Sequence, residues 1–193
     1  MPGHPRVKRN ARPKRKFTKH TYKKAKPSLL KDFEGRCAYS LQHVQKIGWT
    51  TMEVDHHNPT LSEQQRHRYE NLFPAIRHCN GAKSDTWPSK WARSKGVRFL
   101  NPCKEADYGA QIFEDPETHL LVGTTPAAVY HIRVLSLNAD FLVNERHERA
   151  LLRKLLNETA FTSKALTPGS LLEAIAKLRS QVALMIPPIP AGP

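Results

Sequence analysis

The sequence of 193 residues contains only three cysteines, and it lacks any long apolar run. Three cysteines cannot all pair, which argues against a disulfide scaffold and favours a reducing, cytoplasmic location. No apolar run approaches the roughly 18 residues that a membrane-spanning helix needs. The basic start is not followed by the apolar stretch of a secretion signal. We therefore expect neither membrane insertion nor secretion.

Acidic side chains are absent from residues 1–26, which carry eleven of the 31 lysines and arginines. Since the whole chain has a formal net charge of +14, only +3 of it lies after residue 26. Frequent prolines and few apolar side chains predict a disordered basic arm over residues 1–27. Dense positive charge binds nucleic-acid phosphates, so we expect Lys14, Arg15 and Lys16 to contact nucleic acid. The alternative is a solubility tail or a nuclear address.

The rest of the chain is expected to form an α+β fold of short elements. Caps, turns and alternating apolar residues predict a helix over residues 28–33, hairpins over residues 37–57 and around Asp115 and Pro116, and a short helix that residues 71–83 lead into and that Pro88 and Gly96 limit. They also predict three C-terminal helices, one that starts at Pro126 and two that cover residues 141–156 and 171–185. We accordingly divide the chain into the arm (1–27), a central domain (28–96) and a C-terminal α+β supporting region (97–193).

Side chains suited to metal-dependent hydrolysis gather in the middle of the sequence. Asp55 is a hard oxygen ligand for Mg²⁺, and the neutral imidazole of the adjacent His56 accepts protons near neutral pH. Asn80 offers a second oxygen ligand at the start of a helix. Lys83 shares that helical face and could meet a phosphate. Because Mg²⁺ takes few protein ligands, this set is sufficient for phosphodiester hydrolysis.

Three short motifs follow one another in this region: D-H-x-x-P at 55–59, Y-x-N-L at 69–72 and C-N-x-x-K-S-D at 79–85. Their order resembles the HNH endonucleases, whose motif has the ββα-metal fold, over residues 37–88. The resemblance implies that Asp55 and Asn80 bind Mg²⁺ or Mn²⁺ and that His56 is the general base. It also implies that Asn71 ties the loop together and orients His56. His57 has no fixed role, and either lines the phosphate site or faces solvent.

The function that the resemblance implies is a DNA endonuclease or nickase of low intrinsic sequence specificity. One such site cuts one strand, so a double-strand break needs a second event or a second subunit, and the leucine-rich C-terminal segments could form a homodimer contact. Stand-alone HNH proteins act in phage packaging, homing, restriction or anti-phage defence, among which the sequence does not choose. The alternative is a non-catalytic nucleic-acid-binding protein, which would not require the complete set of Asp55, His56, Asn71 and Asn80.

Many HNH domains carry a structural zinc ion on two C-x-x-C pairs, and each pair in this sequence has lost one cysteine. The pairs read Cys37-Ala-Tyr-Ser40 and Ile76-Arg-His-Cys79, and isoleucine cannot bind a metal. Structural zinc sites are almost always four-coordinate. We therefore expect no structural zinc, and we expect Cys37, Ile76 and Cys79 to be small apolar core residues.

Two tryptophans, Trp87 and Trp91, lie four residues apart beside Lys90, Arg93 and Lys95. This arrangement could form a stacking and phosphate-binding surface for DNA. Packing in the core is an equally good interpretation, because aromatic pairs at helical spacing are usually buried.

Overall fold

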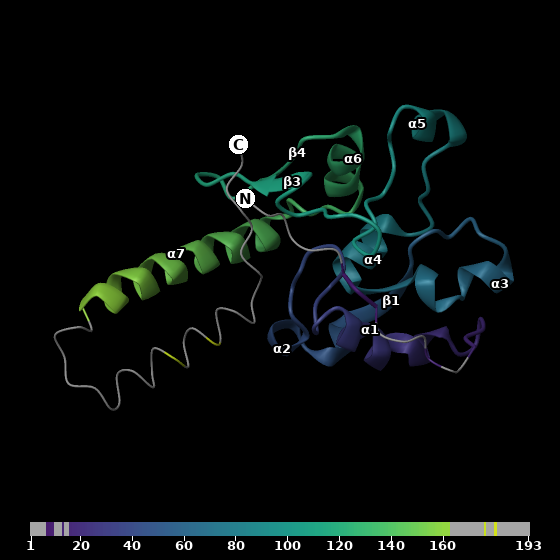
Figure 1. Ribbon diagram of the computed structural model, residues 1–193, viewed down its shortest axis with the longest axis horizontal. Coiled ribbons are helices and arrows are strands. Elements are labelled where there is room, and N and C mark those ends of the chain that lie inside the picture. The colour runs from purple at the N-terminus through teal and green to yellow at the C-terminus, as the bar shows by residue number, and fades with distance from the viewer. Residues whose placement is uncertain (1–6, 10–12, 14–15, 163–175, 177–179, 181–193) are drawn as a thin grey trace.

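The computed structural model describes residues 7–9, 13, 16–162, 176 and 180. These residues form a mixed α+β fold, as expected, with two separate two-stranded sheets (Figure 1). The first half contains η1 (Tyr22–Ala25), α1 (Lys26–Asp32), α2 (Val44–Ile47), η2 (Trp49–Thr51), β1 (Met52–His56), α3 (Glu63–Arg66), η3 (Tyr69–Asn71), β2 (Leu72–Ile76) and α4 (Arg77–Lys83). The second half contains α5 (Lys90–Ser94), β3 (Ile112–Glu114), β4 (Leu121–Gly123), α6 (Pro126–Val134) and α7 (Asp140–Thr162).

The central unit has the order strand, loop, strand, helix. β1 and β2 are antiparallel, with Met52 opposite Ile76 at one end and His56 opposite Leu72 at the other. α4 begins directly after β2 and packs against both strands. The carboxyl-terminal end of β1 and one face of α4 therefore lie side by side.

The expected hairpin over residues 37–57 is wrong. α2 and η2 occupy much of that segment, where an isolated bridge joins Arg36 to His43. β1 pairs instead with β2, whose five residues are all buried. Met52 shares a buried cluster with Ile76, and Val54 shares one with Leu72, so pairing with this apolar strand helps to bury both.

The N-terminal segment is folded where the structure describes it, which corrects the expectation of a disordered arm. The N–H of Val7 donates to the carbonyl of Pro102 over 2.7 Å. The guanidinium of Arg9 donates to the carbonyls of Tyr69 and Leu72 over 2.8 and 2.9 Å. Composition alone missed these contacts, because each of them joins the segment to residues far along the chain.

Helical structure begins at Tyr22, earlier than the helix expected from Ser28. Pro27 lies in the first turn of α1, where its missing N–H leaves no hydrogen bond unmade. Ala25 and Leu29 are buried in a small cluster beside β1. Of the three residues predicted to contact nucleic acid in this segment, Lys16 is exposed. The other two, Lys14 and Arg15, lie outside the described residues.

The second hairpin is confirmed, since β3 and β4 are antiparallel on either side of Asp115 and Pro116. The predicted start of α6 is also confirmed, because the Thr125 side chain accepts a hydrogen bond from the N–H of Ala128. α7 begins at Asp140, one residue before its expected start. The helix expected over residues 171–185 falls almost entirely outside the described residues. No helix in the described ranges is long and apolar enough to cross a membrane.

One large apolar cluster joins the two halves of the chain. It includes Tyr39 and Phe73 from the first half and Leu100 and Leu137 from the second. The region after residue 96 therefore packs on the strand–helix unit, in keeping with a supporting role. The same cluster contains the three residues that the sequence placed in the core: Cys37, Ile76 and Cys79.

His131 of α6 is fully buried, and burial lowers the pKa of its imidazole to about 3. Its Nδ1 accepts the N–H of Leu100 over 3.1 Å, so the neutral ring fits this position. An unfolded histidine titrates near pH 6.5. The unfolded chain therefore takes up a proton that the folded chain does not. The resulting stability is present above about pH 6.5 and is lost as the pH falls toward about 3.

We expect acidification from about pH 7 to about pH 5 to lower the free energy of unfolding by about 2 kcal/mol through His131 alone. Urea unfolding at both pH values measures this loss. His131→Asn keeps an acceptor for Leu100 but does not titrate, so its stability should change less between the two pH values. Equal losses in the two proteins would contradict the prediction.

Candidate active site

Asp55 lies near the end of β1 with its carboxylate buried among hydrogen-bond donors. Only 4% of its surface is exposed. Lys83 of α4 donates to Oδ1 over 2.9 Å, and the hydroxyl of Tyr39 donates to Oδ2. Burial raises the pKa of this carboxyl group, and the ammonium of Lys83 opposes the rise. Asp55 and Lys83 thus form a buried ion pair.

Lys83 is fully buried, which corrects the expectation that it contacts a phosphate. Its ammonium also donates to the carbonyl of His56 over 2.8 Å and lies 5.6 Å from the ring centroid of Phe99. A buried carboxylate requires a cation or several donors, because burying an unpaired charge is costly. The direction of the Lys83 side chain is therefore set by its ion pair with the buried Asp55 carboxylate, and not by its place on a helical face.

His56 packs against η1 and the residue that follows α3. Its ring centroid lies 4.5 Å from that of Tyr22, and its Nε2 lies 2.9 Å from Nδ1 of His67. Burial lowers the pKa of His56 to about 4, and His67 adds to this effect. The ring is therefore neutral at neutral pH, the state in which a general base accepts a proton, although it is a weaker base than an exposed imidazole. Nothing in the sequence distinguished His67 from its polar loop.

Asn71 closes the loop between β1 and β2. Its Oδ1 accepts the N–H of Asn58 over 2.9 Å, and its Nδ2 donates to the carbonyls of Asn58 and Arg66. The backbone N–H of His57 donates to the carbonyl of Asn71 over 2.8 Å. These bonds fix the chain immediately after His56, as the loop-tying role implied by the resemblance requires.

His57 neither lines a phosphate site nor faces solvent. Its side chain is buried, and its ring centroid lies 4.8 Å from that of Phe73 and 5.6 Å from that of Trp87. Burial lowers the pKa of His57 to about 3, so it stays neutral. His57 is therefore a core residue rather than part of the site.

Asn80 lies on the face of α4 that packs on β1, but its hydrogen bond joins it to Glu53 rather than to Asp55. Its Nδ2 donates to Oε2 of Glu53 over 2.7 Å, and Arg77 donates to Oε1 over 3.0 Å. Burial would raise the pKa of Glu53, but these hydrogen bonds lower it. Glu53 was missed in the sequence, although a residue two positions before Asp55 shares its strand face.

A cavity of about 310 Å³ opens beside Glu53 and Asn80. The N-terminal segment borders it with Tyr22, Lys23 and Lys26. Lys26 donates to two backbone carbonyls, and Lys23 is exposed. The ring of Tyr22 also contacts His56, which does not itself line the cavity, so this tyrosine joins the histidine to the border of the cavity. An anionic group in this cavity would meet two ammonium groups.

The oxygen donors at this cavity fit a hard divalent cation. Glu53 offers a carboxylate and Asn80 an amide oxygen, and Mg²⁺ usually takes one or two carboxylates and completes its shell with water and substrate. The oxygens of both carboxylates already accept hydrogen bonds, those of Glu53 from Arg77 and Asn80. Asp55 fits less directly, because it is buried and Lys83 would have to release one of its oxygens. Among the described residues, no three histidine, cysteine, aspartate or glutamate side chains are grouped so as to hold a metal. A metal here would therefore have few protein ligands.

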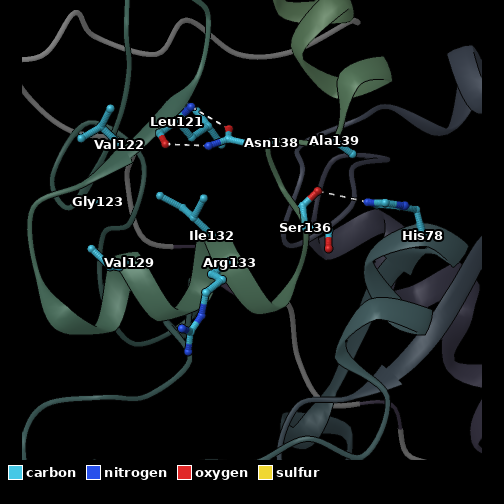
Figure 2. A pocket seen from close by; sticks show the side chains of 10 residues that line it. All are labelled: His78, Leu121, Val122, Gly123, Val129, Ile132, Arg133, Ser136, Asn138 and Ala139. Atoms are coloured by element: carbon cyan, nitrogen blue, oxygen red, sulfur yellow. Dashed lines mark hydrogen bonds between the residues drawn. The ribbon is translucent and has the colours of Figure 1, made fainter.

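A larger cavity, of about 760 Å³, involves none of these residues. It lies between β4, α6 and the turn into α7, as Figure 2 shows. Two of its polar side chains are engaged in the fold: Asn138 bonds to the N–H and carbonyl of Leu121, and the ring of His78 bonds to the carbonyl of Ser136. The cavity thus presents mainly apolar surface rather than a catalytic set.

Comparisons of the chain with protein-family models, with curated proteins and with solved structures find no match. The function is therefore inferred from the residues themselves and from the geometry of β1, α4 and the N-terminal segment.

Proposed function

We propose that the protein is a metal-dependent endonuclease of the HNH type that hydrolyses phosphodiester bonds in DNA. The observation that carries the proposal is the packing of α4 on β1. It brings Asn80 against Glu53 and Lys83 against Asp55, directly before His56. The order β1, loop, β2, α4 agrees with the ββα order that the resemblance implies.

Each residue then has a chemical task. A divalent cation would stabilise the negative charge that develops on the scissile phosphate and on the leaving oxygen. Glu53 and Asn80 are the side chains placed to hold it, and Asp55 becomes a third donor if Lys83 releases one oxygen. His56 accepts the proton of the attacking water, because its ring is neutral at neutral pH. Asn71 keeps the following loop in place.

The substrate is proposed to be DNA, held by its phosphates. Lys23 and Lys26 border the cavity beside the oxygen donors, and Lys16 is exposed on the same basic segment. Phosphate contacts position a duplex without reading its sequence, which fits an enzyme of low sequence specificity. One site of this kind acts on one strand, so the expected product is a nick.

Purified protein is expected to nick supercoiled plasmid DNA with Mg²⁺ or Mn²⁺ and to stop when a chelator removes the metal. Asn80→Ala should lower cleavage by about 10–100-fold, and excess Mg²⁺ should restore part of the rate if the lost group binds metal. Gly81→Ala is the matched control, because a methyl group at this neighbouring position meets no atom within 4 Å.

Two results would contradict the catalytic proposal. One is cleavage that persists in chelator. The other is an Asn80→Ala protein that cuts as fast as wild type, since the amide oxygen would then play no part in the reaction.

A non-catalytic nucleic-acid-binding protein is the second candidate, and the burial of Asp55 favours it. A carboxylate whose oxygens accept from Lys83 and Tyr39 can serve stability alone. If supercoiled, single-stranded and branched DNA all stay intact with Mg²⁺ and with Mn²⁺ while the protein binds them, this second candidate is favoured.

A further inference from the structure

α5 lies at the outer end of the loop that follows α4 (Figure 1), and it carries Trp91. Trp91 has 73% of its surface exposed, more than any other large apolar residue described. Exposing an aromatic side chain of this size forgoes the free energy that its burial would contribute. An exposed ring of this size is available to contact another molecule, and the side chains around it indicate which kind.

The loop that carries Trp91 is held firmly at its base. The Trp87 ring centroid lies 5.6 Å from that of His57 and 5.7 Å from that of Phe99. Pro88 is buried as well. Of the two tryptophans that the sequence left open, Trp87 therefore belongs to the core and Trp91 to the surface.

The charge around Trp91 has one sign. Lys90, Arg93 and Lys95 are all exposed on or next to α5. No aspartate or glutamate occurs between residues 86 and 104. The surroundings of Trp91 are thus cationic and polar, with Ser89 capping the helix. Lysine is depleted at protein–protein interfaces, whereas lysine and arginine beside an exposed aromatic ring suit a nucleic acid.

We infer that α5 is a single-stranded nucleic-acid contact, in which Trp91 stacks on an unpaired base and Lys90, Arg93 and Lys95 bind the neighbouring phosphates. A stacking ring needs an exposed base face, which a paired duplex does not offer away from its ends. The contact lies on the segment that leaves the end of α4. It would engage unpaired nucleotides, such as those of a flap or a bubble.

This inference does not depend on the proposed catalysis, because it is tested by binding in the presence of a chelator. Fluorescence anisotropy of a labelled oligothymidine strand measures affinity for the wild type and for Trp91→Ala. The loss of one stacking contact should weaken binding about 10-fold, whereas Trp91→Phe should keep most of the affinity. Leu151→Ala is the matched control, since Leu151 is a similarly exposed apolar residue on α7.

Two further measurements separate stacking from charge. Replacing Lys90, Arg93 and Lys95 by glutamine should flatten the salt dependence of single-strand binding by up to about two log units per log unit of salt. Trp91→Ala should leave this slope unchanged and should affect blunt duplex binding much less than single-strand binding. A Trp91→Ala protein that binds the single strand as tightly as wild type overturns the inference.

Discussion

Replacing His56 by alanine is expected to lower the rate of DNA cleavage by about 10²–10⁴-fold, the usual contribution of general acid–base catalysis. The ring is neutral at neutral pH, and it contacts Tyr22 at the edge of the cavity. Alanine removes the proton acceptor but leaves Glu53 and Asn80 to hold a metal. DNA affinity should change little, because it depends on phosphate contacts from lysines rather than on a neutral imidazole.

Plasmid nicking and DNA binding measured on the same preparation test this prediction. His20→Ala is the matched control, because it removes an exposed imidazole from the N-terminal segment and should cleave at the wild-type rate. Equal cleavage by wild type and by His56→Ala would assign the activity to a contaminant or to another part of the protein.

The elements that could be predicted from the sequence are those specified by neighbouring residues. The alternation of Met52 and Val54 with polar residues, stopped by Asn58 and Pro59, indicated the strand that carries Asp55. The second hairpin and the capped start of α6 have equally local signals. Each depends on a turn or a cap that acts over a few residues.

The strand that pairs with β1 could not be predicted, because β2 is a fully buried strand and lacks the alternation of apolar and polar residues that marks a half-buried strand. β2 is buried along its whole length, so its sequence, Leu-Phe-Pro-Ala-Ile, shows no period of two. Pro74 also weakens a strand prediction, since proline lacks the N–H that a sheet uses. The local pattern therefore suggested a hairpin before β1, and the structure pairs β1 with a strand after it.

The partners of the cationic side chains Arg9 and Lys83 could not be predicted from the sequence either. Arg9 lies in a basic, proline-rich segment, yet it bonds to carbonyls some 60 residues away. Lys83 occupies a helical face that suited a phosphate, yet a carboxylate 28 residues earlier binds it. Composition and helical spacing describe only local surroundings, so neither could reveal these partners. Glu53, in contrast, was within reach through its place on the same strand face as Asp55.

Removing the ammonium group of Lys83 is expected to lower the free energy of unfolding by about 3–5 kcal/mol. The group is fully buried and donates to Asp55 and to the carbonyl of His56. Lys83→Met keeps an unbranched side chain of similar size but leaves the Asp55 carboxylate buried without its cation. In the described part of the chain, Tyr39 is the side-chain donor that then remains for that carboxylate, which is insufficient for a charge shielded from water.

Denaturant unfolding of wild type, Lys83→Met, Asp55→Asn and the double variant measures the coupling between the two side chains. The double variant should recover part of the loss, because it buries no unpaired charge. Arg77→Met is the matched control on α4, since its ion pair with Glu53 is exposed and should contribute less than about 1 kcal/mol. If Lys83→Met unfolds at the wild-type denaturant concentration, the buried pair contributes little. Lys83 could then leave Asp55 at small cost, and both residues would be available to a metal and a phosphate.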